Sequence, residues 1–150
     1  MILPISLLAG GLAAGALCLS ALGGAPMLVA LPVHQYVNVH KFLVTRFDPF
    51  MPICLLVALL ADATIAVLAP GDLVRALAVT GALLYAGVIT VSLTKNVPIN
   101  RWIAALDPAD LPADWHSVDP RARWRSWNMV RTCLAVTALV AGVSMVGVLL

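Results

Sequence analysis

Glutamate is absent from this sequence, and only 11% of its 150 residues are charged. Soluble domains have about a quarter of their residues charged and about half of them apolar. Here 62% of the residues are hydrophobic, which places the chain among membrane proteins. The net charge of +2 is too small to indicate binding to nucleic acid.

Cysteine and histidine are scarce as well, with three of each. The cysteines stand far apart and form no CxxC pair or other metal-type spacing. The sequence also lacks a Gly-rich phosphate loop, a GxSxG nucleophile turn, an HExxH zinc motif and the carboxylate–histidine pairs of di-iron bundles. The common signatures of nucleotide-binding proteins, serine hydrolases and metalloenzymes are therefore missing.

Long apolar runs dominate what is present. Each is near the roughly 20 residues that cross a hydrocarbon core about 30 Å thick. The first run has no Lys or Arg before it and is long enough to span, so we interpret it as a membrane helix rather than a signal peptide. We expect a single integral membrane domain over 1–150, all-α, folded as a four-transmembrane-helix bundle. The four predicted helices cover residues 5–30, 51–69, 73–94 and 128–150.

Small residues spaced four apart occur in the first and last runs, at Gly11 and Gly15 and at Ala138 and Gly142. Such spacing lets helix backbones approach closely in lipid, so we expect these faces to pack within the bundle. The same faces could pair two copies of the chain, and a homo-oligomer is therefore left open.

The connections between the runs carry most of the positive charge. Lys and Arg concentrate in 32–49 and 95–127, whereas the short turn at Pro70-Gly71 is followed only by Arg75. Cytoplasmic loops carry an excess of Lys and Arg. We therefore expect a protein of the inner membrane with both termini outside and the two larger loops in the cytoplasm.

The segment 32–50 shows helical periodicity with two unlike faces. His34 falls on a polar stripe, whereas Tyr36 and His40 fall on the apolar one. We expect an amphipathic helix that lies at the interface or extends the first run into the cytoplasm. His40 could be a base, a ligand or a buried structural residue. On one ideal helix His34 and His40 point apart, so they share a metal ion only if the segment breaks between them.

A sharply polar stretch, TKNVPINRWI, closes the third run. Pro98 has no N–H and disfavours helix at the preceding residue, so we expect the third membrane helix to end near Asn96. Asn96 and Asn100 could simply satisfy the freed backbone groups at this depth. Alternatively, they present amides to a ligand oxygen.

A third polar stripe leads into the last run. Trp124, Asn128 and Arg131 are spaced i, i+4, i+7 and therefore share one helix face. A charge inside an apolar helix indicates a functional site. The alternatives are that Arg131 reaches lipid phosphates, with Trp124 and Trp127 as interface anchors, or that it pairs with Asp48.

Asp62 lies about two thirds of the way along the second run. It could pair with Arg75 or be close enough to the outer face to be wet, and the sequence does not choose between these.

The combination of NVPIN, a polar loop and RWRSWNMVR before the last apolar run resembles the anthrone-oxygenase-like family of small four-helix membrane proteins. DPFMP at 48–52 fits the same pattern. The resemblance spans most of the chain and is tightest over 94–135. Many relatives carry His where this chain has Asn128, so a role of that His would be lost here or moved to His40.

The resemblance implies oxidation of a polycyclic phenolic ketone at an activated carbon. Such a carbon acid needs a base, for which His40 is the candidate. Its enolate oxygen needs donors, for which Asn96, Asn100, Asn128 and Arg131 are candidates. The catalytic set we expect is therefore His40, Asn96, Asn100 and Arg131.

A flat apolar small-molecule substrate would enter from the lipid bilayer. Once ionised, such an electron-rich substrate can react with oxygen without a cofactor, and the sequence leaves the cofactor unknown. We expect the substrate-binding set to be Tyr36, Trp102, Trp124 and Asn128. Two alternatives remain open. One is a metal- or haem-dependent oxidoreductase that uses His34 or His40. The other is a non-enzymatic membrane scaffold or lipid-binding subunit.

Overall fold

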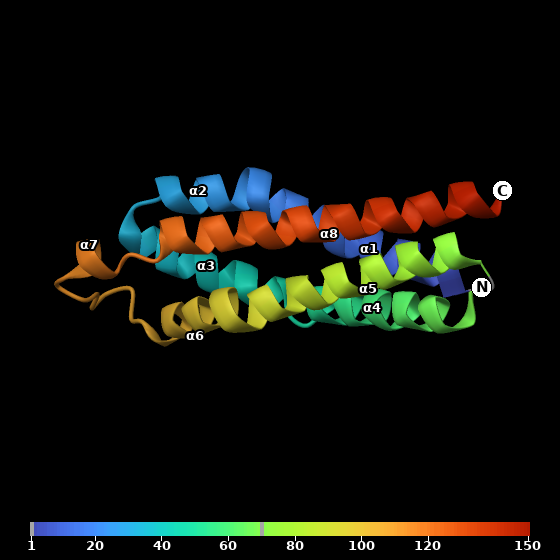
Figure 1. The fold of residues 1–150 in the computed structure, drawn as a ribbon. Coiled ribbons are helices and arrows are strands. Elements are labelled where there is room, and N and C mark those ends of the chain that lie inside the picture. The colour runs from blue at the N-terminus through green and yellow to red at the C-terminus, as the bar shows by residue number, and fades with distance from the viewer. Residues whose placement is uncertain (1, 70) are drawn as a thin grey trace.

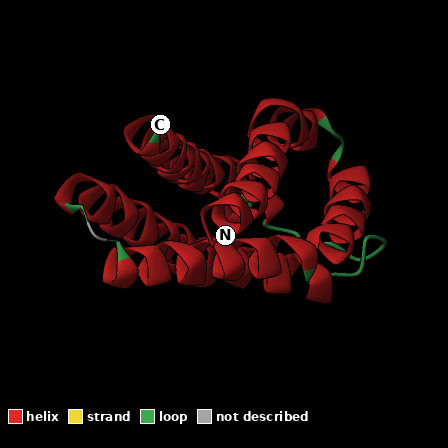
Figure 2. Ribbon diagram, turned by 90° about the vertical axis from the view of Figure 1, so that its right-hand side faces the viewer, coloured by secondary structure: helices red, strands yellow, loops and turns green. Residues whose placement is uncertain are grey.

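A computed structural model describes residues 2–69 and 71–150 of the chain. Within these ranges the regular structure is helical, and Figure 2 shows no strand. The elements in chain order are α1 (Ile2–Leu19), η1 (Ser20–Gly24), α2 (Ala25–Ala30), α3 (Val33–Phe47), α4 (Phe50–Leu68), α5 (Asp72–Val91), η2 (Ser92–Asn96), α6 (Val97–Ala105), α7 (Trp115–Val118) and α8 (Arg121–Leu149).

The prediction of four membrane helices in an all-α bundle is confirmed. Four helical stretches are long and apolar enough to cross a membrane. Both termini lie at the same end of the bundle, at the right in Figure 1, as an even number of crossings requires. Which end faces the cytoplasm stays a prediction. The four stretches are Ile2–Ala30, Phe50–Leu68, Asp72–Ala105 and Trp115–Leu149.

The expected end of the third helix near Asn96 is wrong. A π-helical turn, η2, joins α5 to α6, and the helix continues through Pro98 to Ala105. At this turn the N–H of Val97 bonds the carbonyl of Ser92, five residues back. The wider turn changes the hydrogen-bond register just before the residue that has no N–H, so the helix absorbs the proline.

The first helix shows the same arrangement. The π-helical turn η1 ends at Gly24, and Pro26 stands in the first turn of α2. Both π turns are five residues long, begin with a serine and end two residues before a proline. The loop expected over 95–127 is also largely helical, since α6, α7 and the first seven residues of α8 fall within it.

The bundle is longer than a membrane is thick. At 1.5 Å per residue α4 is about 28 Å long, close to the hydrocarbon core, whereas the stretch from α5 to α6 is about 51 Å long. The helix α4 does not extend to the end of the bundle opposite the termini. At that end α3 occupies the fourth position and contacts α2 and α6 (Figure 1).

The amphipathic character of α3 is confirmed, since His34 is exposed while Tyr36 and His40 are each 1% exposed. However, α3 neither lies across the bundle end nor extends α2, because it runs back along the bundle (Figure 1).

The close-packed glycines differ from those we expected. A Cβ at Gly11 or Gly15 would meet nothing within 4 Å, whereas one at Gly10 would overlap the hydroxyl of Tyr85. A Cβ at Gly142 would lie 3.1 Å from Leu7, so this expected contact is present.

Asp62 neither pairs with Arg75 nor reaches the solvent-exposed surface. It is fully buried, and Ser6 Oγ donates to its Oδ1 at 2.5 Å. Gly81 gives the carboxyl group room, because a Cβ there would overlap Oδ2. Arg75 instead bonds Asp72 at 3.3 Å near the surface. Asp62 therefore joins α4 to α1 and α5 in the half of the bundle that contains the termini.

Candidate functional site

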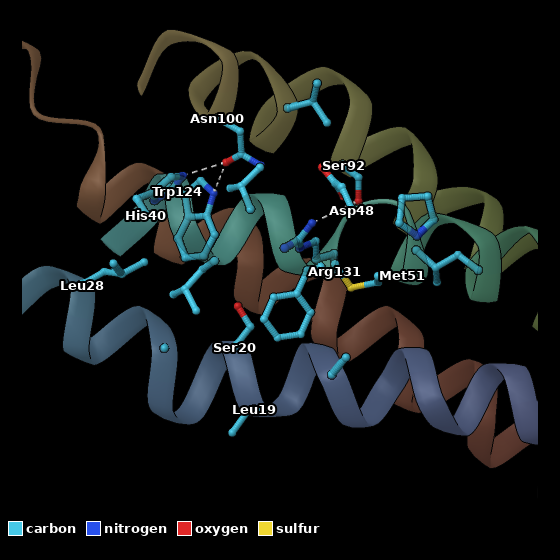
Figure 3. A pocket seen from close by; sticks show the side chains of 18 of the residues that line it. Leu19, Ser20, Leu28, His40, Asp48, Met51, Ser92, Asn100, Trp124 and Arg131 are labelled. Atoms are coloured by element: carbon cyan, nitrogen blue, oxygen red, sulfur yellow. Dashed lines mark hydrogen bonds between the residues drawn. The ribbon is translucent and has the colours of Figure 1, made fainter. Parts of the chain in front are cut away.

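A cavity of about 380 Å³ lies beside the residues where α4 begins. Because α4 has about the length of a hydrocarbon core, we expect this level to lie near one membrane face. Apolar side chains form most of its wall, and polar groups enter from several helices (Figure 3). This volume is within the range of small-molecule sites. The polar residues of the lining are Ser20, His40, Asp48, Ser92, Asn100, Trp124 and Arg131.

Asn100 lies between two donors from different helices. Trp124 Nε1 donates to Asn100 Oδ1 at 2.9 Å, and His40 Nε2 lies 3.0 Å from the same oxygen (Figure 3). An indole nitrogen is only a donor, so the side-chain oxygen of Asn100 must face it. The Nδ2 group of Asn100 makes no hydrogen bond with the described residues and is free to meet a ligand.

This arrangement selects one tautomer of His40. Because Asn100 Oδ1 can only accept, His40 Nε2 must carry the proton, and in the neutral ring Nδ1 holds the lone pair. Nδ1 is buried and has no hydrogen-bond partner among the described residues. Burial lowers the pKa of His40 below its usual 6.5, and the hydrogen bond to Asn100 offsets part of this lowering. His40 is therefore a neutral base at pH 7.

A row of aromatic rings extends from this group away from the cavity. The ring of His40 meets Trp124 at 5.2 Å and Tyr36 at 5.3 Å between centroids, both edge to face. Tyr36 meets Trp115 at 6.1 Å, and Trp115 stacks on Trp102 at 5.9 Å. Burial raises the pKa of the Tyr36 hydroxyl, which keeps it neutral.

Tyr36 and Trp102, expected to bind substrate, do not line the cavity. Tyr36 packs against the His40 ring on the side away from the cavity, and Trp102 contacts Tyr36 only through Trp115.

Arg131 is the positively charged group of the cavity and is 7% exposed. Its Nε and Nη2 donate to Asn128 Oδ1 at 3.0 and 2.7 Å, and its Nη1 donates to Ser92 Oγ at 3.4 Å. Ser20 Oγ donates to the same Asn128 oxygen at 3.4 Å. Asp48 shares the cavity but forms no ion pair with Arg131 within 4.0 Å, so the pairing considered from the sequence is not formed.

Asn96 and Asn128 are fully buried behind the cavity wall rather than in it. Asn96 Nδ2 donates to the carbonyl of Trp124 at 3.3 Å and so connects η2 to α8. Asn128 holds Arg131. The four residues that the structure brings together around the cavity are therefore His40, Asn100, Trp124 and Arg131.

Ser20 and Ser92 are cavity residues that sequence reasoning missed. Each begins a π-helical turn, and each reaches the pair formed by Asn128 and Arg131. In the sequence each of these serines stands six residues before a proline inside an apolar run, Ser20 before Pro26 and Ser92 before Pro98, and this spacing could have indicated the π-helical turns.

His34, the other candidate metal ligand, is exposed and lies outside the cavity. It occupies the face of α3 opposite to His40. Among residues 2–69 and 71–150 no three His, Cys, Asp or Glu side chains are grouped as a metal site would require. The alternative of a haem or metal held by His40 alone stays a prediction.

Comparison with known proteins identifies the family. The family model for anthrone oxygenase matches residues 41–141, which is more than half of the chain. The match includes Asn100, Trp124 and Arg131 and begins one residue after His40. No curated protein and no solved structure matches the chain. The chain belongs to the anthrone oxygenase family, as the sequence resemblance predicted.

Proposed function

We propose that this protein is a membrane oxygenase that acts on an activated CH₂ group of a flat, apolar aromatic ketone of the anthrone type. The observation that carries the proposal is the meeting of His40, Asn100 and Arg131 in one mostly apolar cavity beside the start of α4. The name of the family supports the same reaction class.

The reaction consumes one oxygen molecule per substrate. Loss of a proton from the CH₂ group gives an enolate, which is electron-rich enough to reduce O₂ and form a C–O bond. Protonation gives a hydroperoxide, and loss of water from it leaves a ketone. One oxygen atom is thus retained in the product, the other leaves as water, and no external reductant is required.

His40 is the base in this scheme. Its neutral imidazole has an unpaired lone pair at Nδ1 and lies in the cavity wall. Since Nδ1 is buried, proton transfer to it requires the ring to turn toward the cavity. A positioned base of this kind contributes about 100-fold or more to the rate.

The donors for the enolate oxygen are Asn100 and Arg131. The Nδ2 group of Asn100 is left free by the bonds that His40 and Trp124 make to Oδ1. Buried donors of fixed direction stabilise developing negative charge strongly. Asn96 and Asn128 act as positioning residues, because they hold α8 and Arg131 rather than face the cavity.

Oxygen uptake with anthrone tests the proposal. The wild-type protein in lipid nanodiscs should consume oxygen and form anthraquinone faster than empty nanodiscs, which correct for spontaneous oxidation. His40→Ala should lower the rate about 100-fold or more. His34→Ala is the matched control, since His34 is exposed on the same helix, and its rate should equal that of wild type. A wild-type rate no higher than that of empty nanodiscs would refute the proposal.

Metal content and the absorbance spectrum of the same preparation separate this scheme from the metal- or haem-dependent alternative. Stoichiometric metal or a haem band, lost in His40→Ala, would make His40 a ligand and replace the cofactor-free mechanism. Equal rates with and without a chelator are the result expected here.

A further inference from the structure

We infer that the ligand of this cavity carries an ionised acidic group, a phenolate or carboxylate on an apolar body, which pairs with Arg131. The inference rests on the proposed site and specifies its substrate class. It concerns a charge present before any reaction, and is therefore separate from stabilisation of an enolate that forms during it.

Arg131 forms no direct ion pair, and Asp48, which lines the same cavity, attracts it only over a longer distance. The side chain of Arg131 is 7% exposed, and no carboxylate oxygen of the described residues lies within 4.0 Å of it. Burying an ionised group without a partner of opposite charge is costly. A ligand that supplies the missing negative charge would remove much of this cost.

The guanidinium group of Arg131 has hydrogen-bond donors that no protein group uses among the described residues. It has five N–H groups, and three hydrogen bonds use three of them, to Asn128 twice and to Ser92 once. Two N–H groups are left for a ligand. A guanidinium group presents its donors in a fork that fits a carboxylate or two neighbouring oxygens.

The rest of the cavity wall is mainly apolar. Apart from Arg131 the cavity is lined mainly by aliphatic and aromatic side chains, and its volume of about 380 Å³ accommodates several rings. The cavity also lies at the level where α4 begins, which we expect to be near a membrane face. An amphiphile with an acidic group would partition to this depth from the bilayer.

Asp48 is the charge that opposes such a ligand. It lines the cavity but is exposed, so solvent screens it more than it screens Arg131. The two residues therefore provide variants with opposite expected effects. Removing the positive charge should weaken binding of an anion, and removing the negative charge should strengthen it.

Equilibrium dialysis measures the affinity of the protein for 2-naphthoate and for its methyl ester. The protein is held in nanodiscs of neutral phosphatidylcholine, and binding to empty nanodiscs is subtracted. Arg131→Gln should weaken 2-naphthoate binding about 10- to 100-fold and change binding of the ester less than about threefold. Asp48→Asn should tighten 2-naphthoate binding about threefold. Arg123→Gln, an exposed charge on the same helix outside the cavity, is the matched control and should have no effect.

Absence of naphthoate binding to wild type, or an equal loss of both ligands in Arg131→Gln with the fold retained, would overturn the inference. If circular dichroism shows that Arg131→Gln does not fold, Asp48→Asn decides, and an unchanged or weaker affinity for 2-naphthoate overturns it. Repeating the titration in nanodiscs with an anionic phospholipid identifies the source of the anion. If the anionic phospholipid weakens 2-naphthoate binding in wild type but not in Arg131→Gln, the acidic group belongs to a lipid headgroup. If the phospholipid does not compete, the acidic group belongs to a soluble acid.

Binding is measured under nitrogen, which makes the result independent of the proposed reaction. Preference for the acid without anthrone turnover would leave the binding inference standing and remove the oxygenase. Anthrone turnover without preference for the acid would do the reverse.

Discussion

Arg131 donates two hydrogen bonds to a single oxygen of Asn128, one turn earlier on α8, at 3.0 and 2.7 Å. The i, i+3 spacing holds this pair together by helix geometry. A neutral amide here occupies the position where a carboxylate would cancel the charge of Arg131. The cavity keeps a positive charge for this reason.

Asn128→Asp should therefore stabilise the protein and weaken the site. The carboxylate has nearly the shape of the amide, replaces the unpaired Nδ2 and forms an ion pair with Arg131. We expect the free energy of unfolding to rise by about 1–2 kcal/mol and the affinity for 2-naphthoate to fall toward that of Arg131→Gln. Thermal unfolding and dialysis measure the two effects. Lower stability together with unchanged affinity would contradict the role of this pair.

Protonation of His40 should remove both activity and some stability as the pH falls. The folded-state pKa of His40 lies below its usual 6.5, because burial disfavours the charged ring. The unfolded chain then binds the proton more readily, so this stability is present above pH 6.5 and is lost as pH falls through the folded-state pKa. We expect oxygen uptake to be constant near pH 7 and to fall with a midpoint below pH 6.5.

Two variants control the pH experiment. His34→Gln should keep the wild-type profile, since that side chain is exposed on the opposite face of α3. His40→Phe should remove the pH dependence of stability in this range. A rate in wild type that does not change between pH 7 and 5 would mean that His40 only positions Asn100.

Trp124→Phe should allow His40 to adopt both neutral tautomers. The variant keeps the ring that packs on His40 but loses the N–H that fixes the Asn100 oxygen. The amide can then rotate and donate to the imidazole, so both tautomers should be populated, and stability should fall by about 0.5–1.5 kcal/mol. Nitrogen chemical shifts of His40 report the tautomer. Trp127→Phe is the control, because the Trp127 indole N–H makes no hydrogen bond within the described residues, and a similar change in both variants would count against the mechanism.

Gly81→Ala should destabilise the bundle. An added Cβ would overlap Oδ2 of the buried Asp62, and overpacking of this kind costs about 1–3 kcal/mol. Gly11→Ala is the control, since a Cβ there meets nothing within 4 Å and alanine favours helix by about 1 kcal/mol. Unfolding in mixed detergent micelles should show opposite shifts for the two variants. Equal stability of the two would show that Asp62 does not need the space.

Features that depend on one segment at a time could be predicted from the amino-acid sequence. Run length gave four membrane helices, because the hydrocarbon thickness fixes how many apolar residues a span needs. Helical periodicity placed His40 inside and His34 outside, because the face of a single amphipathic helix is a local property. The motifs around Pro98 and Arg131 indicated the family, and the family model confirmed it.

Which polar groups meet depends on the packing of helices that are distant in sequence. His40 and Asn100 are 60 residues apart, and Ser20 and Asn128 are 108 apart, so no local pattern reports these pairs. Helical periodicity says that a side chain is buried but not whether it faces a neighbouring helix or a cavity. Asn96 and Asn128 were therefore grouped with Asn100 from the sequence, although only Asn100 lines the cavity.

The π-helical turns show the same limit. Proline ordinarily interrupts a helix, yet packing of α5 and α6 against α8 and α3 keeps this one continuous past Pro98. Ser92, the first residue of the wider turn, accepts a hydrogen bond from Arg131 of α8, and this contact depends on where α8 lies. Composition and periodicity thus fixed the membrane fold, whereas the packing of helices distant in sequence fixed the chemistry of the site.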